Sequence, residues 1–549
     1  MCGIFALINN TIHRDSTHVK TQFEKGKGRG PEFSSLSNVG KDVIFGFHRL
    51  AINGLNVSSN QPLLNKNGSI ILICNGEIYN YKELYKLMGV EPNTQSDCEV
   101  ILHLYEKYGI DHTLQMLDGV FAFILLDNRS MDSKIYVARD PYGVRPLYSF
   151  VRNNIDYGFA SEAKMLSEFS GTITHFPPGN VAEFTMPDRA ICEWSHIKTQ
   201  KYHMTGFASS YVHISTSQTS KTILANIRQH LTSAVYKRCC TTERPIACLL
   251  SGGLDSSLIA ALVSQYHKEN DLPPIETYSI GLIGSEDLKY ARIVSDYLGT
   301  KHTEVVITEQ DFIDAVPTVI RSIESYDTTT VRASIGNWLL GKYISEHSQA
   351  KVIFNGDGSD ELCGGYLYMG ACPDTIEYDK ECRRLLTDIH AFDVLRSDKS
   401  ISSHGLEPRT PFLDRAWVQY YLSILPEVRC HNNSGNPEKY LLRSAFESQD
   451  ILPKTVLWRR KEAFSDGVSG NARSLYEIMR DHAETIDLDV NISPVYTHNP
   501  PQTAEQRWYR RIFEEAYPGL GHLVPYFWMP KYVEAKDASA RTLDLYKSV

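Results

Sequence analysis

The sequence contains no long apolar run, no basic leader and no regular spacing of cysteines. Its longest apolar runs, such as Phe121–Leu126, are far too short to span a bilayer. Met1–Phe5 includes no basic segment followed by an apolar run, so we expect no secretory signal. The 11 cysteines include no CxxC pair, and the adjacent Cys239 and Cys240 suit neither a zinc knuckle nor an ordinary disulfide. A reducing, cytoplasmic location is therefore expected.

An excess of positive charge is also missing. The formal net charge is −9. General nucleic-acid binders and membrane-surface binders both need a basic face, so we expect neither partner, although a local basic pocket for a nucleotide is still allowed. The 549 residues are too many for one hydrophobic core, and at least two domains are expected.

The first part of the chain has the pattern of a β-rich domain. Short apolar runs between turns predict strands at Val43–Phe47, Ile70–Cys74, Phe121–Leu126 and Ile135–Ala138. Apolar residues at helical spacing after an acidic start predict a helix over Ser96–Tyr108. A Ser- and Thr-rich stretch with little periodicity indicates a linker. We therefore assign residues 1–200 to a first domain, 201–225 to the linker and 226–549 to a second domain.

The second domain alternates strands and helices. Strands are predicted at residues 245–250, 276–280, 304–307 and 351–355, with helices at 255–267 and 287–298 and a long helical stretch before the last strand. This alternation is typical of an α/β domain, with a parallel sheet and helices on both faces. From about residue 373 onward the pattern is mainly helical.

Cys2 is the strongest candidate for a catalytic residue in the first domain. Removal of Met1 would leave a thiol and a free α-amine on one residue. The reference pKa of an α-amine is about 7.7–8.0, so the amine can act as the base for the thiol and no distant histidine is needed. The alternative interpretation is a small buried cysteine without a catalytic role.

Polar residues that follow two predicted strands strengthen the catalytic interpretation. Arg49 comes at a strand end, where an arginine can hold a carboxylate through two parallel hydrogen bonds, or form a surface ion pair. Asn75 and Gly76 follow the next strand, and an Asn amide with a Gly backbone N–H can form an oxyanion hole. Asp97, at the start of the predicted helix, could bind an α-ammonium group or cap the helix.

Taken together, these segments resemble the class II glutamine amidotransferases. The matching segments are MCGIFALI, HRLAI, QPL, CNGEIYNY, SDCEV, LDGVFAF and ARDPYGVRPLY. The resemblance implies an N-terminal-nucleophile (Ntn) hydrolase fold of the α+β class, with two sheets sandwiched between helices. It also implies that Cys2 attacks the side-chain amide of glutamine and that Asn75 and Gly76 hold the oxyanion. Arg49, Asn75, Glu77 and Asp97 would bind the glutamine. The segment Arg29–Glu32 departs from the family, which usually has Asp after the proline.

A glycine-containing turn lies between a strand and a helix in the second domain. It reads Ser251-Gly252-Gly253-Leu254-Asp255-Ser256-Ser257. Small residues let a backbone approach a phosphate, and a helix N-terminus supplies N–H groups. No GK[ST] follows, so this is not a Walker A loop. Asp255 could hold Mg²⁺ through its carboxylate, or the turn could be an ordinary capped helix start. The segment resembles the loop of ATP-pyrophosphatases, which cut ATP between the α- and β-phosphates.

A second polar loop follows the last predicted strand. Residues Asn355–Glu361 include three carboxylates and two glycines, which suggests a metal site, a proton-handling site or a solvated acidic loop. The preceding strand places this loop at a sheet end, where α/β proteins bind ligands. That position favours a functional role.

Nearly the whole chain now resembles the asparagine synthetase family. Matching segments include ETYSIGL, YDTTTVRASIGNWLLGKYI, GDGSDELCGGYLYM, HAFDVLRSDKS, GLEPRTPFLD, EKYLLRSAF and RRKEAFSDGVS. The resemblance implies an adenine-nucleotide α-hydrolase-like fold for this domain, with Mg²⁺ as cofactor and ATP, aspartate and glutamine as substrates. The residues that it implies for ATP are Leu249, Ser251, Gly252, Gly253, Asp255, Ser256, Gly356 and Lys461. Asp255 and Asp360 would bind Mg²⁺ with pyrophosphate, and Thr329, Thr330 and Arg332 would line the aspartate and adenylate site.

The resemblance also implies the reaction. The aspartate β-carboxylate would attack the α-phosphate of ATP, and ammonia would then displace AMP to give asparagine. One residue departs from the family: Asp357 stands where the family usually has Glu, the base that helps ammonia attack. Its carboxylate is one methylene shorter, and a displacement of about 1 Å can lower a rate about a hundredfold. We therefore expect a catalytic base at Asp357 in an active but slower enzyme.

Two alternatives differ from this prediction. One is another amide-forming synthetase on the same scaffold, such as a β-lactam synthetase-like enzyme, although those commonly lack the nucleophilic cysteine. The other is a weakly active regulatory relative, supported only by the changes at Asn355 and Asp357. The sequence does not define the oligomeric state, and a homodimer is the assembly to test.

Overall fold

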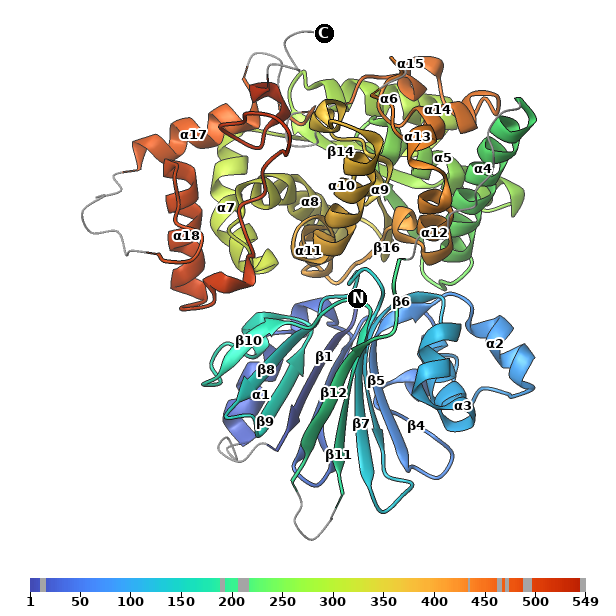
Figure 1. Cartoon of the computed structure of the whole chain (residues 1–549), viewed down its shortest axis with the longest axis vertical. Helices are drawn as coiled ribbons and strands as arrows, with labels where there is room; N and C mark the ends of the chain where they lie inside the picture. Colours follow the sequence, from blue (N-terminus) through green and yellow to red (C-terminus); the bar gives the residue numbers. More distant parts are fainter. Residues whose placement is uncertain are drawn as a thin grey trace. The chain divides into compact units, whose positions relative to one another are not determined.

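The computed structural model describes residues 1–9, 16–187, 193–205, 217–432, 435–461, 467–469, 473–486 and 496–543. The chain divides into two compact units (Figure 1). Unit 1 contains residues 1–204, 241–244 and 402–407; unit 2 contains residues 205–240, 245–401 and 408–549. No helix of the described ranges is long and apolar enough to cross a membrane.

Unit 1 contains two six-stranded sheets. The strands of the first, in spatial order, are β10 (Thr172–His175), β8 (Tyr148–Arg152), β9 (Asp156–Ala160), β1 (Gly3–Ile8), β3 (Val43–Arg49) and β2 (Phe33–Gly40). Those of the second are β12 (Ser195–Lys201), β11 (Asn180–Met186), β7 (Ser133–Arg139), β6 (Gly119–Asp127), β5 (Ile70–Ile78) and β4 (Leu63–Leu64). The strand pairs of both sheets are antiparallel, as the pairs of β1 with β3 and of β5 with β6 illustrate.

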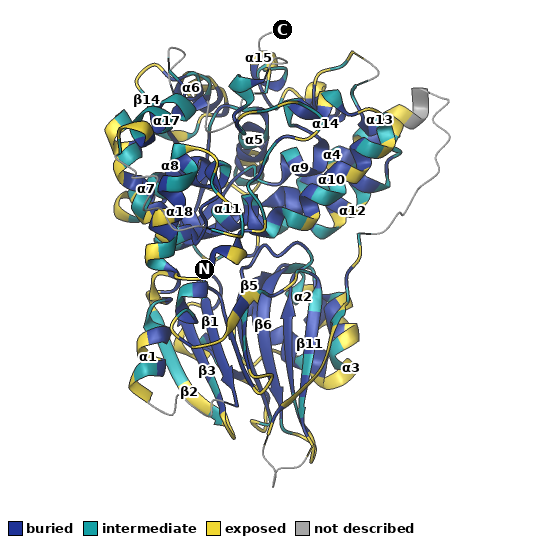
Figure 2. Ribbon diagram, turned by 60° about the vertical axis from the view of Figure 1, so that its left-hand side comes forward, coloured by how far each residue is buried: buried dark blue, intermediate teal, exposed yellow. Residues whose placement is uncertain are grey.

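The cores of unit 1 follow from alternation along these strands. Ile4 and Ile8 of β1 share one core with Ile71 and Ile73 of β5, so the two sheets pack face to face. On the other face of the second sheet, a separate core joins β5 and β6 to helices α2 (Tyr81–Met88) and α3 (Val100–Met116). Helix α1 (Ser16–Glu24) packs on the first sheet, where Phe23 lies 6.0 Å from Phe5 between ring centroids. These layers confirm the predicted αββα arrangement, and β1, β3 and β6 are buried over most of their length (Figure 2).

Two sequence predictions for unit 1 need correction. Asn75, Gly76 and Glu77 do not follow a strand but lie inside β5, because its ladder with β6 continues to the pair of Ile78 with Gly119. The helix predicted at Ser96–Tyr108 begins as a 3₁₀ turn at Asp97–Glu99 and continues as α3. Of the predicted linker, residues 201–225, the stretch 206–216 lies outside the described ranges. Helix α4 (Ser217–Cys239) begins before the predicted end of this linker.

Unit 2 is built on a five-stranded sheet. Its spatial order is β15 (Lys301–Ile307), β14 (Glu276–Leu282), β13 (Ile246–Leu249), β16 (Val352–Phe354) and β17 (Glu407–Arg409). The pairs of β13 with β14 and β16, and of β14 with β15, are parallel, which confirms the predicted sheet. The chain moves outward from β13 to β15 and then returns to β16 on the other side. The loops after β13 and β16 therefore meet at a topological switch point, where such sheets bind ligands.

Helices account for most of the rest of unit 2. Helices α5 (Leu254–Glu269), α6 (Glu286–Leu298) and α8 (Thr328–His347) contact the sheet, and α7 (Glu309–Ile323) packs on α8. The later helices are α9 (Ser359–Cys363), α10 (Thr375–Asp388), α11 (Asp393–Ser402), α12 (Arg415–Ser423), α13 (Pro426–Arg429), α14 (Tyr440–Glu447), α15 (Lys454–Leu457), α17 (Leu475–Thr485) and α18 (Ala504–Ala516). A mainly helical region after residue 373 was predicted.

Candidate functional sites

Cys2 lies immediately before β1 in unit 1. Alternation along the strand puts its side chain on the same side as Ile4, and the half-buried thiol packs against the core between the two sheets. Its Sγ is 3.6 Å from the carbonyl oxygen of Leu50, and burial raises the pKa of the thiol. Met1 precedes it, and burial lowers the pKa of the Met1 amine to about 6. Arg29 Nε donates to the Cys2 carbonyl oxygen at 2.9 Å.

Arg49, the last residue of β3, is held by the loop that follows it. Its guanidinium donates to the carbonyl oxygens of Asn53, Gly54 and Asn56 and to Oδ1 of Asn60, the last at 2.6 Å. Among the described residues, no carboxylate lies within ion-pair distance of this guanidinium. A buried, oriented cation without a carboxylate partner can bind the carboxylate of a ligand.

Asn53 connects two of the predicted glutamine-binding residues. Its Nδ2 donates to Glu77 Oε2 at 2.7 Å and contacts Asp97 Oδ1 at 3.4 Å. Asp97 Oδ2 accepts a hydrogen bond from the Ile78 backbone N–H at 2.7 Å. Burial raises the pKa of Asp97 to about 6. The structure therefore brings Arg49, Glu77 and Asp97 around one loop, and Asn53 is the residue that joins them.

Asn75 is fully buried in β5, and neither its amide nitrogen nor its amide oxygen has a hydrogen-bond partner within the described ranges. Alternation places it on the side of Ile71 and Ile73, facing the core against which Cys2 packs. Buried amides are normally satisfied, so this one is free for a ligand. Gly76 has a packing reason to be glycine, because a Cβ there would lie 2.5 Å from the Val120 carbonyl oxygen.

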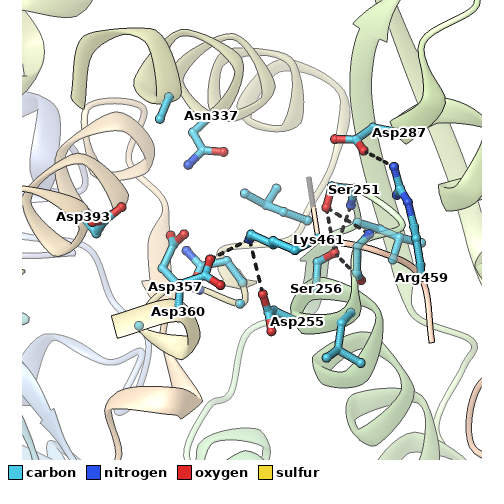
Figure 3. Close-up of a pocket in the computed structure, with 18 of the residues that line it drawn as sticks. Ser251, Asp255, Ser256, Asp287, Asn337, Asp357, Asp360, Asp393, Arg459 and Lys461 are labelled. Atoms are coloured by element: carbon cyan, nitrogen blue, oxygen red, sulfur yellow. Dashed lines mark hydrogen bonds and ion pairs between the residues drawn. The ribbon is translucent and has the colours of Figure 1, made fainter. Parts of the chain in front are cut away.

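A cavity of about 180 Å³ in unit 2 lies at the ends of β13 and β16 (Figure 3). It brings together ten of the predicted residues: Leu249, Ser251, Gly253, Asp255, Ser256, Thr329, Gly356, Asp357, Asp360 and Lys461. Gly252, Thr330 and Arg332 are absent from its lining. Gly252 has φ +72°, and a Cβ there would lie 2.4 Å from the Ala291 nitrogen, so close packing on α6 requires glycine.

The loop after β13 is closed by its own serines. The hydroxyls of Ser251 and Ser256 are 2.9 Å apart, and the Ser256 hydroxyl also accepts from the Ser251 N–H at 3.2 Å. Gly356, from the loop after β16, has no room for a side chain, because a Cβ would lie 2.8 Å from both Asp255 Cβ and the Ser256 nitrogen. The two loops are thus packed backbone to backbone, at the start of α5.

Two lysines bind the predicted metal carboxylates. Lys439 Nζ lies 2.6 Å from Asp255 Oδ2 and 2.5 Å from Asp360 Oδ1. Lys461 Nζ lies 2.6 Å from Asp360 Oδ2 and 3.8 Å from Asp255 Oδ2 (Figure 3). Burial opposes the charge on Asp360, but the two lysines outweigh it and hold the pKa of that carboxyl well below its usual range. The site therefore already holds cationic charge between its two carboxylates.

Asp357 presents two different oxygens. Oδ1 accepts from Arg396 Nη2 at 3.0 Å, and Arg396 also donates to Asp393 Oδ1 at 2.8 Å. Oδ2 is buried and has no partner in the part of the chain that the structure describes. Nearby, the Tyr366 hydroxyl donates to Glu361 at 2.5 Å, and burial with the adjacent Asp393 raises the pKa of Glu361 well above its usual range. One oxygen of Asp357 is therefore available to accept a proton.

The first two turns of α8 carry the three residues predicted for aspartate. Thr329 lines the cavity, whereas the Thr330 hydroxyl donates to Asp327, the N-cap of the helix, at 2.7 Å. Arg332 donates to Glu505 and to Asp537, with Nη1 2.7 Å from Asp537 Oδ1. These contacts turn Thr330 and Arg332 toward buried partners rather than toward the nucleotide cavity.

Sequence reasoning missed several residues of both sites. Arg29 and Asn53 follow no motif that points to a site, because their partners, Cys2 for Arg29 and Glu77 and Asp97 for Asn53, are distant in the sequence. Lys439 and Arg396 lie inside the segments EKYLLRSAF and HAFDVLRSDKS, which carry the family resemblance, but those segments alone assign them no role. The one indication in the sequence for Lys439 was its position as a basic residue directly before an apolar helical segment.

Comparison with known proteins identifies two family matches along the chain. A family model for a glutamine amidotransferase domain matches residues 1–220, and one for asparagine synthase matches residues 226–377 and 372–530. The asparagine synthetase (glutamine-hydrolyzing) of Gallus gallus is 42% identical over 565 residues, covering 100% of this chain and 99% of that protein. Those of Cricetulus griseus and Homo sapiens are each 40% identical over 573 residues with the same coverage. The chain therefore belongs to the family of glutamine-hydrolysing asparagine synthetases.

Proposed function

We propose that this chain makes asparagine from aspartate and ATP, with glutamine as the nitrogen donor. The observation that carries the proposal is that the Lys439 ammonium group forms ion pairs with both Asp255 and Asp360. These three residues line a cavity that Ser251 and Lys461 also line. This arrangement places anionic and cationic groups at the switch point of a parallel sheet, as the handling of a triphosphate requires.

In unit 1, Cys2 is the nucleophile. After removal of Met1, the α-amine of Cys2 takes the thiol proton, and the sulfur attacks the side-chain amide carbon of glutamine. The unpartnered amide of Asn75 and the Gly76 N–H stabilise the oxyanion. The Cys2 α-ammonium group then returns the thiol proton to the amide nitrogen, and collapse of the adduct breaks the C–N bond and releases ammonia. Water then hydrolyses the thioester to glutamate.

The two charged groups on the α-carbon of glutamine need partners of opposite charge. Arg49 offers an oriented guanidinium to the α-carboxylate. Asp97, joined to Glu77 through Asn53, offers a carboxylate to the α-ammonium group, with Glu77 completing the site. This assignment accounts for a buried cation and a buried anion that both contact Asn53.

In unit 2, an oxygen of the aspartate β-carboxylate attacks the α-phosphorus of ATP, and the bond to the β-phosphate breaks. Pyrophosphate leaves and β-aspartyl-AMP remains. Lys461 contacts the departing phosphates. The other residues proposed along the nucleotide are Leu249, Ser251, Gly253, Ser256 and Gly356, and Thr329 is proposed for the adenylate. Gly252, Thr330 and Arg332 do not line the nucleotide cavity and are proposed to hold the glycine turn and the start of α8 in place.

Asp255 and Asp360 fit a Mg²⁺ ion. Both supply hard oxygen donors, and both already contact a single cationic group, the Lys439 ammonium. Mg²⁺ is commonly held by one or two carboxylates together with substrate phosphates. When bound with ATP, it would neutralise charge on the pyrophosphate.

Ammonia then attacks the β-carbonyl carbon of the adenylate, and AMP leaves. Asp357 Oδ2 accepts the proton that the nitrogen loses, while Arg396 holds Oδ1. Because the Asp357 side chain is one methylene shorter than the usual Glu, we expect the attack of ammonia on the adenylate to limit the rate.

Product analysis tests the proposal. The protein is incubated with MgATP, aspartate and amide-¹⁵N-labelled glutamine, and labelled asparagine, AMP and pyrophosphate are expected in equal amounts. The Cys2→Ala variant should lose glutamine-dependent synthesis and keep synthesis from added ammonium. Glutamate without asparagine, even with ammonium present, would contradict the proposal and favour another acceptor acid or a regulatory role.

The proposal includes a cytoplasmic location and a homodimeric assembly. Light scattering after size-exclusion chromatography measures the mass in solution, and a monomer mass would remove the dimer from the proposal.

A further inference from the structure

Helix α8 presents a stripe of four residues to the nucleotide cavity of unit 2. Thr329, Ala333, Asn337 and Leu340 all line it, and their spacing puts them on one face of the helix. Asn337 follows Thr329 by two helical turns, which is roughly 11 Å along the helix axis. The stripe therefore extends from Thr329, proposed for the adenylate, to a part of the cavity two turns away.

Asn337 is a buried amide without a hydrogen-bond partner among the described residues. It is 6% exposed, and its side chain lies with those of the other residues that line the cavity (Figure 3). Buried amides are normally hydrogen-bonded, and leaving one without partners costs free energy. A ligand that offers both an acceptor and a donor to this amide would therefore bind favourably.

The surroundings of Asn337 are apolar or already hydrogen-bonded. Helix α8 packs on β14, and apolar residues from α8, β13 and β14 line the cavity: Leu249, Ile280, Ala333 and Leu340. Two polar residues of β14 also line it. The Tyr278 hydroxyl donates to Glu276 at 2.8 Å, and the Ser279 hydroxyl is 3.0 Å from His302 Nε2. The Asn337 amide thus stands in apolar surroundings, beside hydroxyls that are bonded elsewhere.

The groups proposed to handle the phosphates lie on other elements. Asp255 is in the first turn of α5, Asp360 is in α9, and Lys439 immediately precedes α14. Ion pairs bring these three side chains together, whereas Asn337 lies in the middle of α8. With the phosphates at the ion pairs, the apolar side of the cavity is left for the base. A planar base suits such a space, because its faces are apolar and its edge carries a few polar groups.

We propose that Asn337 reads the adenine base of ATP, with its amide oxygen accepting from the 6-amino group and its amide nitrogen donating to N7. This inference rests on the proposed function, which supplies ATP as the ligand. An asparagine amide matches this edge of adenine, because it offers an acceptor and a donor side by side. Hypoxanthine and guanine present two acceptors there, the 6-oxygen and N7, so either orientation of the amide leaves its oxygen against an acceptor. Asn337 would thus make the site select adenine nucleotides over those of inosine and guanosine.

The test changes single atoms of the base. With ammonium as the nitrogen source, kcat/KM is measured for ATP, inosine triphosphate, 7-deaza-ATP and 2′-deoxy-ATP. Calorimetry gives Kd for AMP and for inosine monophosphate, a readout that needs no catalysis. The variant is full-length Asn337→Leu, which removes the amide at similar volume. Ser334→Ala is the matched control, because Ser334 is buried on the same helix and donates to the Thr330 carbonyl at 2.6 Å but does not line the cavity.

The wild-type protein should prefer ATP to inosine triphosphate and to 7-deaza-ATP by about tenfold each, on the scale by which an amide contact discriminates between bases. Both ratios should fall close to one in Asn337→Leu and keep their wild-type values in Ser334→Ala. A wild-type ratio near one for either analogue, or a ratio that Asn337→Leu leaves unchanged, would overturn the proposal. The wild-type ratios test the same contacts without any substitution.

The remaining outcomes separate this inference from its alternatives. A preference for ATP over 2′-deoxy-ATP that disappears in Asn337→Leu would put the amide at the ribose and overturn the assignment to the base. Wild-type protein that binds AMP about tenfold more tightly than inosine monophosphate, but makes no asparagine, would refute the proposed function and support the role of Asn337.

Discussion

Replacing Lys439 with methionine should reduce folding stability as well as activity. The Lys439 side chain is 1% exposed, and its ammonium group lies between Asp255 and Asp360 at 2.6 and 2.5 Å. Breaking a buried ion pair by removing one partner typically costs about 3–5 kcal/mol, because the remaining charge stays buried and unpaired. Lys461 is 20% exposed and still contacts Asp360, so it compensates only in part. We therefore expect a loss near the lower end of that range.

Urea unfolding measures this loss as a lower midpoint at constant slope. Lys461→Met should lower the free energy of unfolding much less, because water reaches that side chain, while it should abolish most ATP-dependent synthesis. Lys380→Met is the control, since the lysine of the Lys380–Glu377 ion pair is 62% exposed and such surface pairs contribute little to stability.

Mg²⁺ gives a second readout on the same protein. Millimolar Mg²⁺ should restore part of the lost stability in Lys439→Met, because a ligand that binds only the folded state stabilises it. An unfolding midpoint equal to that of the wild type, without Mg²⁺, would refute the reasoning. It would show that the two carboxylates are solvated or protonated rather than neutralised by Lys439.

Three further predictions concern single residues. Asp357→Glu should preserve or raise the rate of asparagine formation, because it restores the methylene that this chain lacks; a strong loss in a steady-state assay would show that the site is built around Asp and its contact with Arg396. Burial raises the pKa of Asp97 to about 6, so its carboxylate takes up a proton as pH falls below that value. Below pH 6 the kcat/KM for glutamine should then fall by a further tenfold per pH unit beyond the loss caused by protonation of the Cys2 α-amine, while the Asp97→Asn variant should be low at every pH and lack this additional fall. Gly76→Ala should destabilise the fold by about 1–3 kcal/mol in urea, because its Cβ would meet the Val120 carbonyl at 2.5 Å. Gly370→Ala, with nothing within 4 Å, should not.

Local patterns along the chain predicted the elements that place most of the sites. The parallel sheet of unit 2 follows from alternating strands and helices, and Arg49 ends a strand as expected. The sequence predicts that Asn75 follows a strand, because its polar side chain interrupts the apolar run. In the structure β5 continues through it, because backbone hydrogen bonds with β6 extend the ladder whatever the side chain. A polar residue inside a strand thus looked like a strand end.

By itself, the sequence determined which short segments carry chemistry. Cys2, the turn at Ser251–Ser257 and the loop at Asn355–Glu361 are local motifs, whose character depends on residues adjacent in the chain. Only the tertiary structure decided their partners. Lys439 reaches Asp255 across 184 residues, and Arg332 reaches Glu505 across 173 and Asp537 across 205. Those contacts depend on how whole helices and loops pack, and packing is settled by the burial of many side chains at once rather than by any motif.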